Sequence, residues 1–442
     1  MSCDKKSHAR MLAGALSVLL HLVCLFSAGM ADAEEYSFDI EEFESKPFEW
    51  GGYAEIKYEH LNLDEDAAFY GLNFYNDPHS TLGRFTGTLQ LELGYKKGMA
   101  AFNTVLNAQA VEDDLGGSDS ADIFEANLSL KLSPSATIDL GKKVFKWGKG
   151  YAWNPVAFID RPKDPNNPEE SLEGYVGAGI DLIRSFSGPL QTLAFTTVVL
   201  PVTEDVNADF GKTDYINLAA KLYLLYQDTD IDLVAFTGDS RTTRYGIDVS
   251  RNLATNFEIH GEYAYLTDLE QKYLTETGTV ATRQRSVSQY LLGLRYLTRN
   301  DITTIFEYYH NGAGFTKSEL DRFYKLVDDA DTQFITTGSD GLFQNAGTIS
   351  SMGYSAPRAG RNYLYLKVNQ KEPFDILYFT PGIIGIYNLD DASYSLSPEI
   401  VYTKFTNWEI RVRCTYLDGG RFTEFKEKQN QYKAELRVRF YF

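Results

Sequence analysis

The last twelve residues of the chain, Gln431 to Phe442, read QYKAELRVRFYF. One set of alternate positions is apolar or aromatic: Tyr432, Ala434, Leu436, Val438, Phe440 and Phe442. The positions between them are mostly charged: Lys433, Glu435, Arg437, Arg439 and Tyr441. A period of two with charges on one face is typical of a β-strand that meets water on that face only. The chain therefore ends in an amphipathic strand whose last residue is aromatic.

Strands of the same kind recur along the rest of the chain. Between residues 124 and 132, for example, Phe124, Leu128 and Leu132 alternate with Glu125 and Lys131. Strand-like segments are expected at 50–60, 83–96, 99–111, 121–132, 135–146, 175–186, 190–201, 213–225, 229–238, 241–251, 255–266, 285–298, 301–310, 360–369, 374–388, 393–404, 407–417 and 431–442. This is about eighteen strands, within a range of 16–18, and an even number suits a closed antiparallel barrel.

The connections between these segments alternate in length. Short turns are expected at Lys97-Gly98, Ser133-Pro134, 187–189, Asp228, Leu253-Ala254, Arg299-Asn300, 370–373 and Thr406. Longer connections are expected at 61–82, 112–120, 147–174, 202–212, 267–284, 311–359 and 418–430, with short exceptions near 239–240 and 389–392. Such parity places the long connections at one end of a single sheet, which an ordinary sandwich has no reason to do.

The N-terminus has the pattern of a secretory signal peptide. Lys5, Lys6 and Arg10 precede an apolar run from residue 11 to 26, and Ala31-Asp32-Ala33 forms a small-residue cleavage site. We therefore expect residues 1–33 to be a signal peptide. Residues 34–48 are rich in Asp and Glu and are expected to form an acidic N-terminal tail in the periplasm.

The aromatic C-terminal strand resembles that of Gram-negative outer-membrane β-barrels, in which it serves as the assembly signal. On this resemblance Phe440 and Phe442 form that signal, and the partners are outer-membrane lipid and the barrel-assembly machinery. The motifs Lys146-Trp147-Gly148, Asn154-Pro155 and 160–165 resemble a poorly characterised porin-like family. The resemblance implies an all-β, transmembrane, antiparallel up-and-down β-barrel over residues 49–442, in the cell outer membrane. Short turns would be periplasmic and long loops extracellular, and the lumen would be wide and wet.

The connection at 147–174 is rich in proline, which prevents regular pairing and favours a stiff extended path. It is either a loop folded into the pore as a constriction or an ordered cap on the rim. As a constriction it would present these charged candidates: Lys146, Lys149, Asp160, Arg161, Lys163 and Asp164.

A second basic cluster lies on the last two strands and consists of Arg411, Arg413, Arg437 and Arg439. In the lumen these arginines would either attract anionic solutes or pair with Glu55 and Glu59 of the first strand, which must close against the last.

The long connection at 311–359 contains the one clear helix signal. Thr316 and Glu319 have the spacing of a capping box, and an apolar stripe runs from Leu320 to Val327. This helix could pack within its own loop or enter the pore mouth as a plug.

Composition and motifs exclude several classes of function. A net charge of −19 argues against nucleic acid. We find no catalytic motif, no metal-ligand spacing and no haem-attachment motif, so no enzyme, metal or cofactor is expected. The favoured function is passive passage of small hydrophilic, and in particular anionic, solutes, by a monomer or a homo-oligomer such as a trimer.

Two alternatives stay open. One is a barrel scaffold for a periplasmic or extracellular partner, such as a polysaccharide or an electron-transfer protein. The other is a channel for hydrophobic compounds, because Leu291 and Leu297 accompany Arg295 on a face expected to line the lumen.

Overall fold

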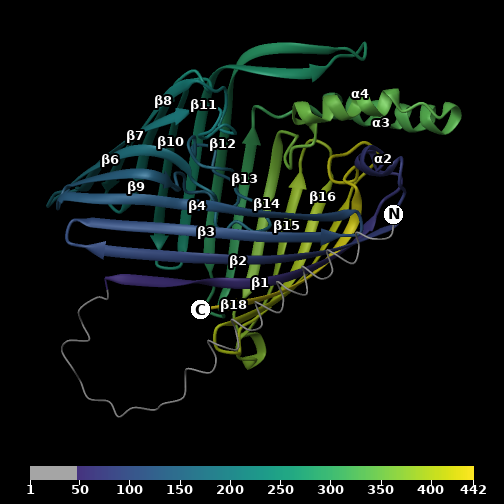
Figure 1. The fold of residues 1–442 in the computed structure, drawn as a ribbon. Helices are drawn as coiled ribbons and strands as arrows, with labels where there is room; N and C mark the ends of the chain where they lie inside the picture. Colours follow the sequence, from purple (N-terminus) through teal and green to yellow (C-terminus); the bar gives the residue numbers. More distant parts are fainter. Residues whose placement is uncertain (1–46) are drawn as a thin grey trace.

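The computed structural model describes residues 47–442, and antiparallel strands make up most of this part (Figure 1). The strands are β1 (Phe48–Leu63), β2 (Thr81–Lys97), β3 (Ala100–Asp113), β4 (Gly116–Ser133), β5 (Ala136–Lys143), β6 (Tyr175–Ser185), β7 (Leu190–Val202), β8 (Tyr215–Tyr226), β9 (Thr229–Thr237), β10 (Arg244–Ala254), β11 (Phe257–Leu274), β12 (Val280–Leu297), β13 (Ile302–Asn311), β14 (Asn362–Gln370), β15 (Phe379–Asn388), β16 (Tyr394–Tyr402), β17 (Trp408–Asp418) and β18 (Asn430–Tyr441). The signal peptide expected at 1–33 and residues 34–46 of the acidic tail lie outside the described residues.

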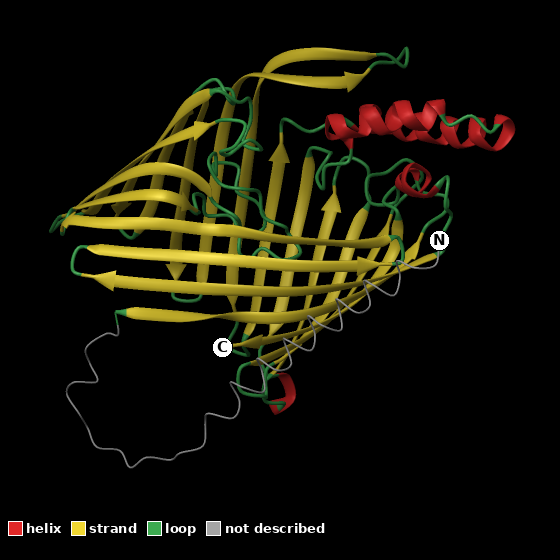
Figure 2. Ribbon diagram, in the orientation of Figure 1, coloured by secondary structure: helices red, strands yellow, loops and turns green. Residues whose placement is uncertain are grey.

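Each strand pairs with its neighbours in sequence, and β18 returns to pair with β1 (Figure 2). At this seam Glu55 is opposite Arg439 and Lys57 is opposite Arg437. Closure leaves no unpaired sheet edge around the wall, which is the condition for strands to cross a lipid bilayer. The predicted eighteen-stranded up-and-down barrel is confirmed.

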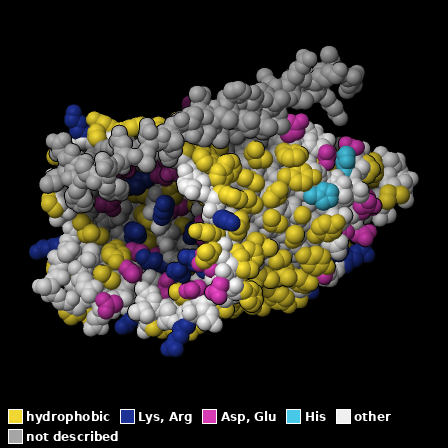
Figure 3. All heavy atoms as spheres, turned by 90° about the horizontal axis from the view of Figure 1, so that it is seen from below, with side chains coloured by type: hydrophobic (Ala, Val, Ile, Leu, Met, Phe, Trp, Pro, Cys, Tyr) yellow, Lys and Arg dark blue, Asp and Glu magenta, His cyan; other side chains and the backbone are white. Residues whose placement is uncertain are grey.

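The barrel carries its apolar face outward. On β18, Leu436 is 45% exposed, whereas its neighbours Glu435 and Arg437 are each 3% exposed. Figure 3 shows a hollow lined by charged side chains beside an outer wall of hydrophobic ones. A soluble barrel has the opposite arrangement, because its apolar side chains must leave water. The wall therefore suits lipid outside and water inside.

The short and long connections are segregated as the alternation predicted. The turns at 98–99, 134–135, 186–189, 227–228, 255–256 and 298–301 lie at one end with the end of β18. The connections at 64–80, 144–174, 203–214, 312–361 and 419–429 lie at the other. The turn between β14 and β15 is longer than expected, because it spans 371–378 and includes the 3₁₀-helix η3 (Pro373–Asp375).

Two expected loops are instead extensions of hairpins. The segment 112–120 leaves only residues 114–115 between β3 and β4, and 267–284 leaves only 275–279 between β11 and β12. The β11–β12 hairpin projects beyond the wall at the top of Figure 1. Both faces of such a projection are polar or mixed, so the period of two that identifies the rest of the wall fades there. The loop interpretation of these two segments was wrong for that reason.

The helix predicted after Thr316 is confirmed as α3 (Lys317–Thr337), with both hydrogen bonds of its capping box. The structure adds α2 (Ala68–Phe74), α4 (Gly341–Ile349) and the π-helix η2 (Ser350–Tyr354), which the sequence did not predict. These elements are too short for a clear helical period. The stripe of α3 packs against residues of α2, α4 and η2. Within residues 47–442, no helix has both the length and the apolar character to cross a membrane.

Candidate functional site: the lumen and its inserted loop

The connection between β5 and β6, residues 144–174, crosses the inside of the barrel. Glu262 on β11 accepts hydrogen bonds from the backbone N–H groups of Lys149 at 2.6 Å and Gly150 at 2.7 Å. Glu307 on β13 accepts one from Ala152 at 2.9 Å. Both carboxylates are buried on the lumen face, far from β5 and β6 in strand order. The loop is therefore attached to the wall opposite its own strands.

Glycine and proline give the loop its path. Proline holds φ near its extended value and cannot pair, so the segment keeps a shape without a sheet of its own. At the turn that surrounds the Glu262 carboxylate, Gly148 adopts a φ of 94°, which side chains rarely tolerate. At Gly150 a Cβ would collide with the carbonyl oxygen of Trp153. The backbone can therefore approach Glu262 closely only with glycine at these positions.

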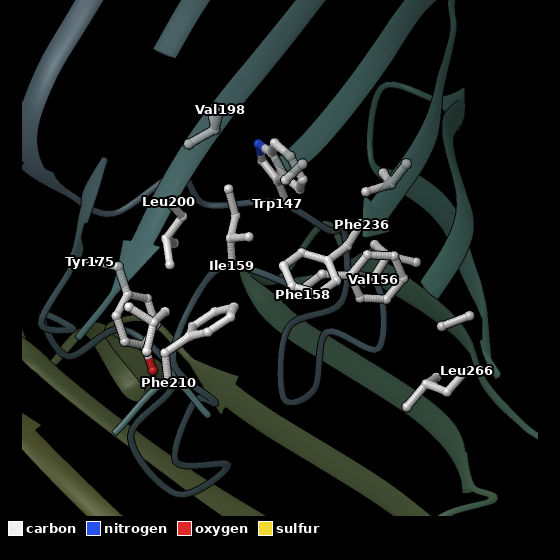
Figure 4. Packing of buried hydrophobic residues seen from close by; sticks show 14 of the residues in the cluster. Trp147, Val156, Phe158, Ile159, Tyr175, Val198, Leu200, Phe210, Phe236 and Leu266 are labelled. Atoms are coloured by element: carbon white, nitrogen blue, oxygen red, sulfur yellow. The ribbon is translucent and has the colours of Figure 1, made fainter. Parts of the chain in front are cut away.

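An apolar cluster fixes the first half of the loop (Figure 4). Trp147, Val156, Phe158 and Ile159 from the loop are buried among wall and connection residues. Those partners include Tyr175, Val198, Leu200, Phe210, Phe236 and Leu266. Apolar side chains on this part of the lumen face are thus covered by the loop, and their burial stabilises its position.

Polar contacts join the second half of the loop to other strands. Asn167 accepts a hydrogen bond from Arg413 on β17 at 2.8 Å, and Glu170 accepts one from Arg437 on β18 at 2.6 Å. Ser171 accepts one from Gln90 on β2 at 3.1 Å. The loop consequently reaches strands on several sides of the barrel and narrows the space between them.

Two cavities share lining residues in this part of the barrel. An interior cavity of about 680 Å³ lies against the loop and the inner faces of β2, β3 and β4. A mouth cavity of about 860 Å³ lies between residues 238–244 and the β11–β12 hairpin. Arg241 and Arg244 line both cavities. These two arginines therefore lie between the two cavities.

The candidate constriction residues fall into two groups. Lys146, Asp160, Arg161 and Lys163 line the interior cavity. Lys149 and Asp164 do not. Lys149 forms an ion pair with Asp232 at 2.9 Å and lies 3.8 Å from Asp248, and both of these carboxylates are buried in the wall. Asp164 accepts hydrogen bonds from Asn166 and Asn167 within the loop.

Burial sets the titration of the loop side chains. It raises the pKa of Asp160, although the N–H groups of Trp147 and Phe145 hydrogen-bond to the carboxylate and partly offset the shift. Burial also lowers the pKa of Lys163, whose ammonium donates to the carbonyl oxygen of Gly150 at 2.9 Å. For Lys149 burial is again the largest single effect and lowers the pKa, but the carboxylates of Asp232, Asp248 and Asp230 together outweigh it, so the pKa is raised.

Each arginine of the C-terminal cluster is in an ion pair. Arg439 pairs with Glu55 at 2.6 Å, and Arg413 pairs with Glu399 at 2.6 Å. Arg437 contacts Glu435, Glu170 and Glu55, and Arg411 contacts Glu409. Glu59 pairs with Lys433 and Lys57 rather than with an arginine. The positive charge of the four arginines is therefore largely compensated by neighbouring carboxylates.

Sequence reasoning missed Arg241, Arg244 and Arg358, which all line the interior cavity. The alternation of inward and outward residues along β10 could have placed one of them, Arg244, on the lumen face. Tyr245 is exposed on the outer face, so Arg244 must face the lumen with Asp248. Nothing local in the sequence, however, indicates that these guanidinium groups lack carboxylate partners.

The aromatic residues at the C-terminus lie at the seam. The ring of Phe442 is 5.9 Å from that of Trp50, and Phe440 is 4.9 Å from Trp408. The backbone of Phe442 exchanges hydrogen bonds with Gly52 at 3.1 and 3.2 Å. The aromatic residues at the end of β18 therefore contact β1 on one side and β17 on the other.

Leu291 and Arg295, which the sequence singled out, both contact the inserted loop. Leu291 is buried with Trp153 and Ala152, and Arg295 donates to the hydroxyl of Tyr151 at 3.4 Å. His260 contacts Glu307 at 2.9 Å beneath the Tyr151 ring. Across residues 47–442, no group of three or more His, Cys, Asp or Glu side chains could hold a metal ion.

Solved structures of two bacterial proteins have a similar fold. Acinetobacter baumannii OccAB1 aligns with a TM-score of 0.52 at 9% identity, over 89% of this chain and 96% of that one. Pseudomonas aeruginosa OccK2 (OpdF), solved in complex with glucuronate, aligns with a TM-score of 0.51 at 10% identity, over 89% and 97%. No family model matches the sequence, and no curated protein matches it significantly. At this identity the likeness concerns the fold alone: the chain is a closed antiparallel β-barrel of eighteen strands, similar in fold to these two proteins.

Proposed function

We propose that the protein is an outer-membrane channel through which small hydrophilic solutes diffuse, with a preference for anions. The observation that carries the proposal is that Arg241 and Arg244 line both the mouth cavity and the interior cavity. Solutes that enter past the β11–β12 hairpin would pass these side chains and then the inserted loop. Nothing in this route requires a chemical step.

The charges along the route support an anion preference. Five cations line the interior cavity without an ion pair to any described residue: Lys146, Lys163, Arg241, Arg244 and Arg358. Several of the acidic side chains there are compensated. Glu169 and Glu170 pair with Lys367 and Arg437, and backbone N–H groups surround Asp160. Low-dielectric walls focus the field of the uncompensated cations onto the solute.

The inserted loop would set the diameter of the channel. A barrel of eighteen strands is otherwise too wide for side chains to fill, so a segment that crosses it decides which solutes pass. The channel of the same fold solved with glucuronate, an organic anion, agrees with this proposal.

Single-channel recording of the purified full-length protein in a planar bilayer tests the proposal. We expect stepwise conductance, and under a salt gradient a reversal potential on the anion-selective side. A folded protein, shown by a heat-dependent gel shift, that gives no conductance at any salt concentration would overturn the channel. A cation-selective reversal potential would overturn the anion preference alone.

A further inference from the structure

Arg244 begins β10 on the lumen face and has no partner for its charge. The side chain makes no hydrogen bond or ion pair with any other residue from 47 to 442, and its Nε is buried without an acceptor. The charged residue that acts on Arg244 is Arg241, and the two positive charges repel each other. A guanidinium in this position is costly unless an anion accompanies it.

Arg241 is held in place without a carboxylate in ion-pair range. Its guanidinium lies over the ring of Phe210 at 3.7 Å and donates to the carbonyl oxygen of Phe158 at 3.2 Å and to that of Phe210. Carbonyl oxygens and an aromatic face orient a cation, but they do not neutralise it. The guanidinium therefore keeps its full charge in a fixed orientation.

A third donor belongs to the same segment. Thr242 lines the mouth cavity, and its buried hydroxyl has no hydrogen-bond partner among the described residues. The acidic residues of the mouth, Asp239, Asp268 and Glu270, do not line the interior cavity. Residues 241–244 thus place two guanidinium groups between the two cavities and a hydroxyl on the mouth side, and no carboxylate lines both cavities.

We infer that residues 241–244 form a binding subsite for the oxyanion of a passing solute, a carboxylate or a phosphate. The inference rests on the proposed function and adds a defined place and a ligand chemistry to it. An oxyanion can accept two parallel hydrogen bonds from a guanidinium, and this geometry is stronger and more selective than attraction to a point charge such as chloride.

The subsite would bind weakly and repeatedly, as a conducting pore requires. A solute that leaves Arg244 would next meet Lys163 and Arg358. Arg358 donates to the carbonyl oxygen of Lys163 at 3.3 Å, and this contact joins the connection at 312–361 to the inserted loop. These cations lie on the inner cavity, so the next favourable position for an oxyanion is on the interior side.

The test is block of chloride current by added oxyanions in the full-length channel. Sodium gluconate and inorganic phosphate are added separately to one side of the bilayer in potassium chloride, and glucose serves as the uncharged control. We expect both oxyanions to reduce the current saturably and glucose to leave it unchanged apart from viscosity. Block by gluconate alone would limit the subsite to carboxylates, and block by phosphate alone to phosphates.

Variants locate the subsite. Arg244→Gln should raise the half-blocking concentration about tenfold or more, and Arg244→Lys should produce an intermediate increase, because it keeps the charge and loses the planar fork. Arg251→Gln is the matched control on the same strand. Its cross-strand partner Ile259 is exposed on the outer face, so Arg251 points away from the lumen. Arg295→Gln removes a charge from the lumen face outside the two cavities.

The outcomes separate the two proposals. A folded wild-type protein without conductance overturns the channel itself. A conducting wild type that shows no saturable block overturns the subsite and leaves the channel standing. Block that is unchanged in Arg244→Gln, or equally weakened in Arg295→Gln, also overturns it. If Arg244→Gln does not fold, Thr242→Val and Arg244→Lys still decide, because each should weaken the block.

Discussion

The side chain of Glu262 accepts the backbone N–H of Gly150 at 2.7 Å, although the two residues are 112 positions apart in the chain. The same carboxylate accepts the N–H groups of Lys149 and Val156 and the amide of Asn154. One buried wall side chain thus satisfies four donors of the inserted loop. This carboxylate therefore attaches the inserted loop to the wall at β11.

The first prediction concerns this attachment. Glu262→Ala leaves three backbone N–H groups without an acceptor, while the Asn154 amide keeps the carbonyl oxygen of Gly150, and this should cost about 3 kcal/mol or more of loop attachment. The loop should then leave its position, so that single-channel conductance rises and its fluctuations increase. Glu258→Gln is the matched control on the same face of β11, since Glu258 contacts only the hydroxyl of Tyr151 in the loop. Equal conductance in both variants would contradict the role of Glu262.

The second prediction concerns the loop itself. Replacing residues 150–172 with a short Gly/Ser turn should widen the passage, because an open eighteen-stranded lumen is far larger than either cavity. Conductance should rise, and ion preference should weaken. Measurement is by single-channel steps and reversal potential, with the heat-dependent gel shift as the check on folding. Unchanged conductance would show that another segment determines the diameter of the channel.

The third prediction tests the charge of the loop residues separately from the diameter of the channel. Reversing both charges in Arg161→Glu with Lys163→Glu should move the reversal potential toward cations, and more strongly at low salt, because the field is then less screened. Arg251→Glu, on the outer face, should leave it unchanged. A selectivity that survives the double reversal would point instead to the other cations of the interior cavity that lack an ion pair, chiefly Arg241, Arg244 and Arg358.

The fourth prediction is a pH dependence at Lys163. Burial lowers the pKa of Lys163 below the usual 10.5, and the carboxylates of Glu262 and Glu307 offset this only in part. The ammonium charge is present below that pKa and is lost as pH rises through it. Anion preference should therefore fall at an alkaline pH below 10.5, and this early fall should be absent in Lys163→Arg. Reversal potentials recorded from pH 7 upward check both statements.

The fifth prediction concerns assembly. Deleting Phe442 removes its contact with Trp50 and the hydrogen bonds to Gly52, so the seam between β1 and β18 loses its last pair. Outer-membrane levels should fall while export to the periplasm continues. Phe374→Asp, at a position 92% exposed on a turn away from the seam, serves as the control. Normal membrane levels without Phe442 would argue against an assembly signal.

Much of the wall could be read from local pattern. The period of two, as in Leu436 between Glu435 and Arg437, is a property of neighbouring residues, so strand number, order and the parity of the loops followed from it. The capping box at Thr316 is equally local. Where both faces of a strand are polar or mixed, as in the β11–β12 projection, the same reasoning failed.

Tertiary structure alone decided which charges are free. Arg437 and Arg244 look alike in the sequence, each an arginine on the lumen side of an amphipathic strand. Closure of β18 on β1 and the path of the inserted loop bring Glu55 and Glu170 to Arg437, and bring only Arg241 to Arg244. Ion pairing depends on distances between residues far apart in the chain, whereas alternation depends on adjacent ones. The sequence by itself therefore determined the barrel, and the folded chain determined where its lumen keeps an uncompensated positive charge.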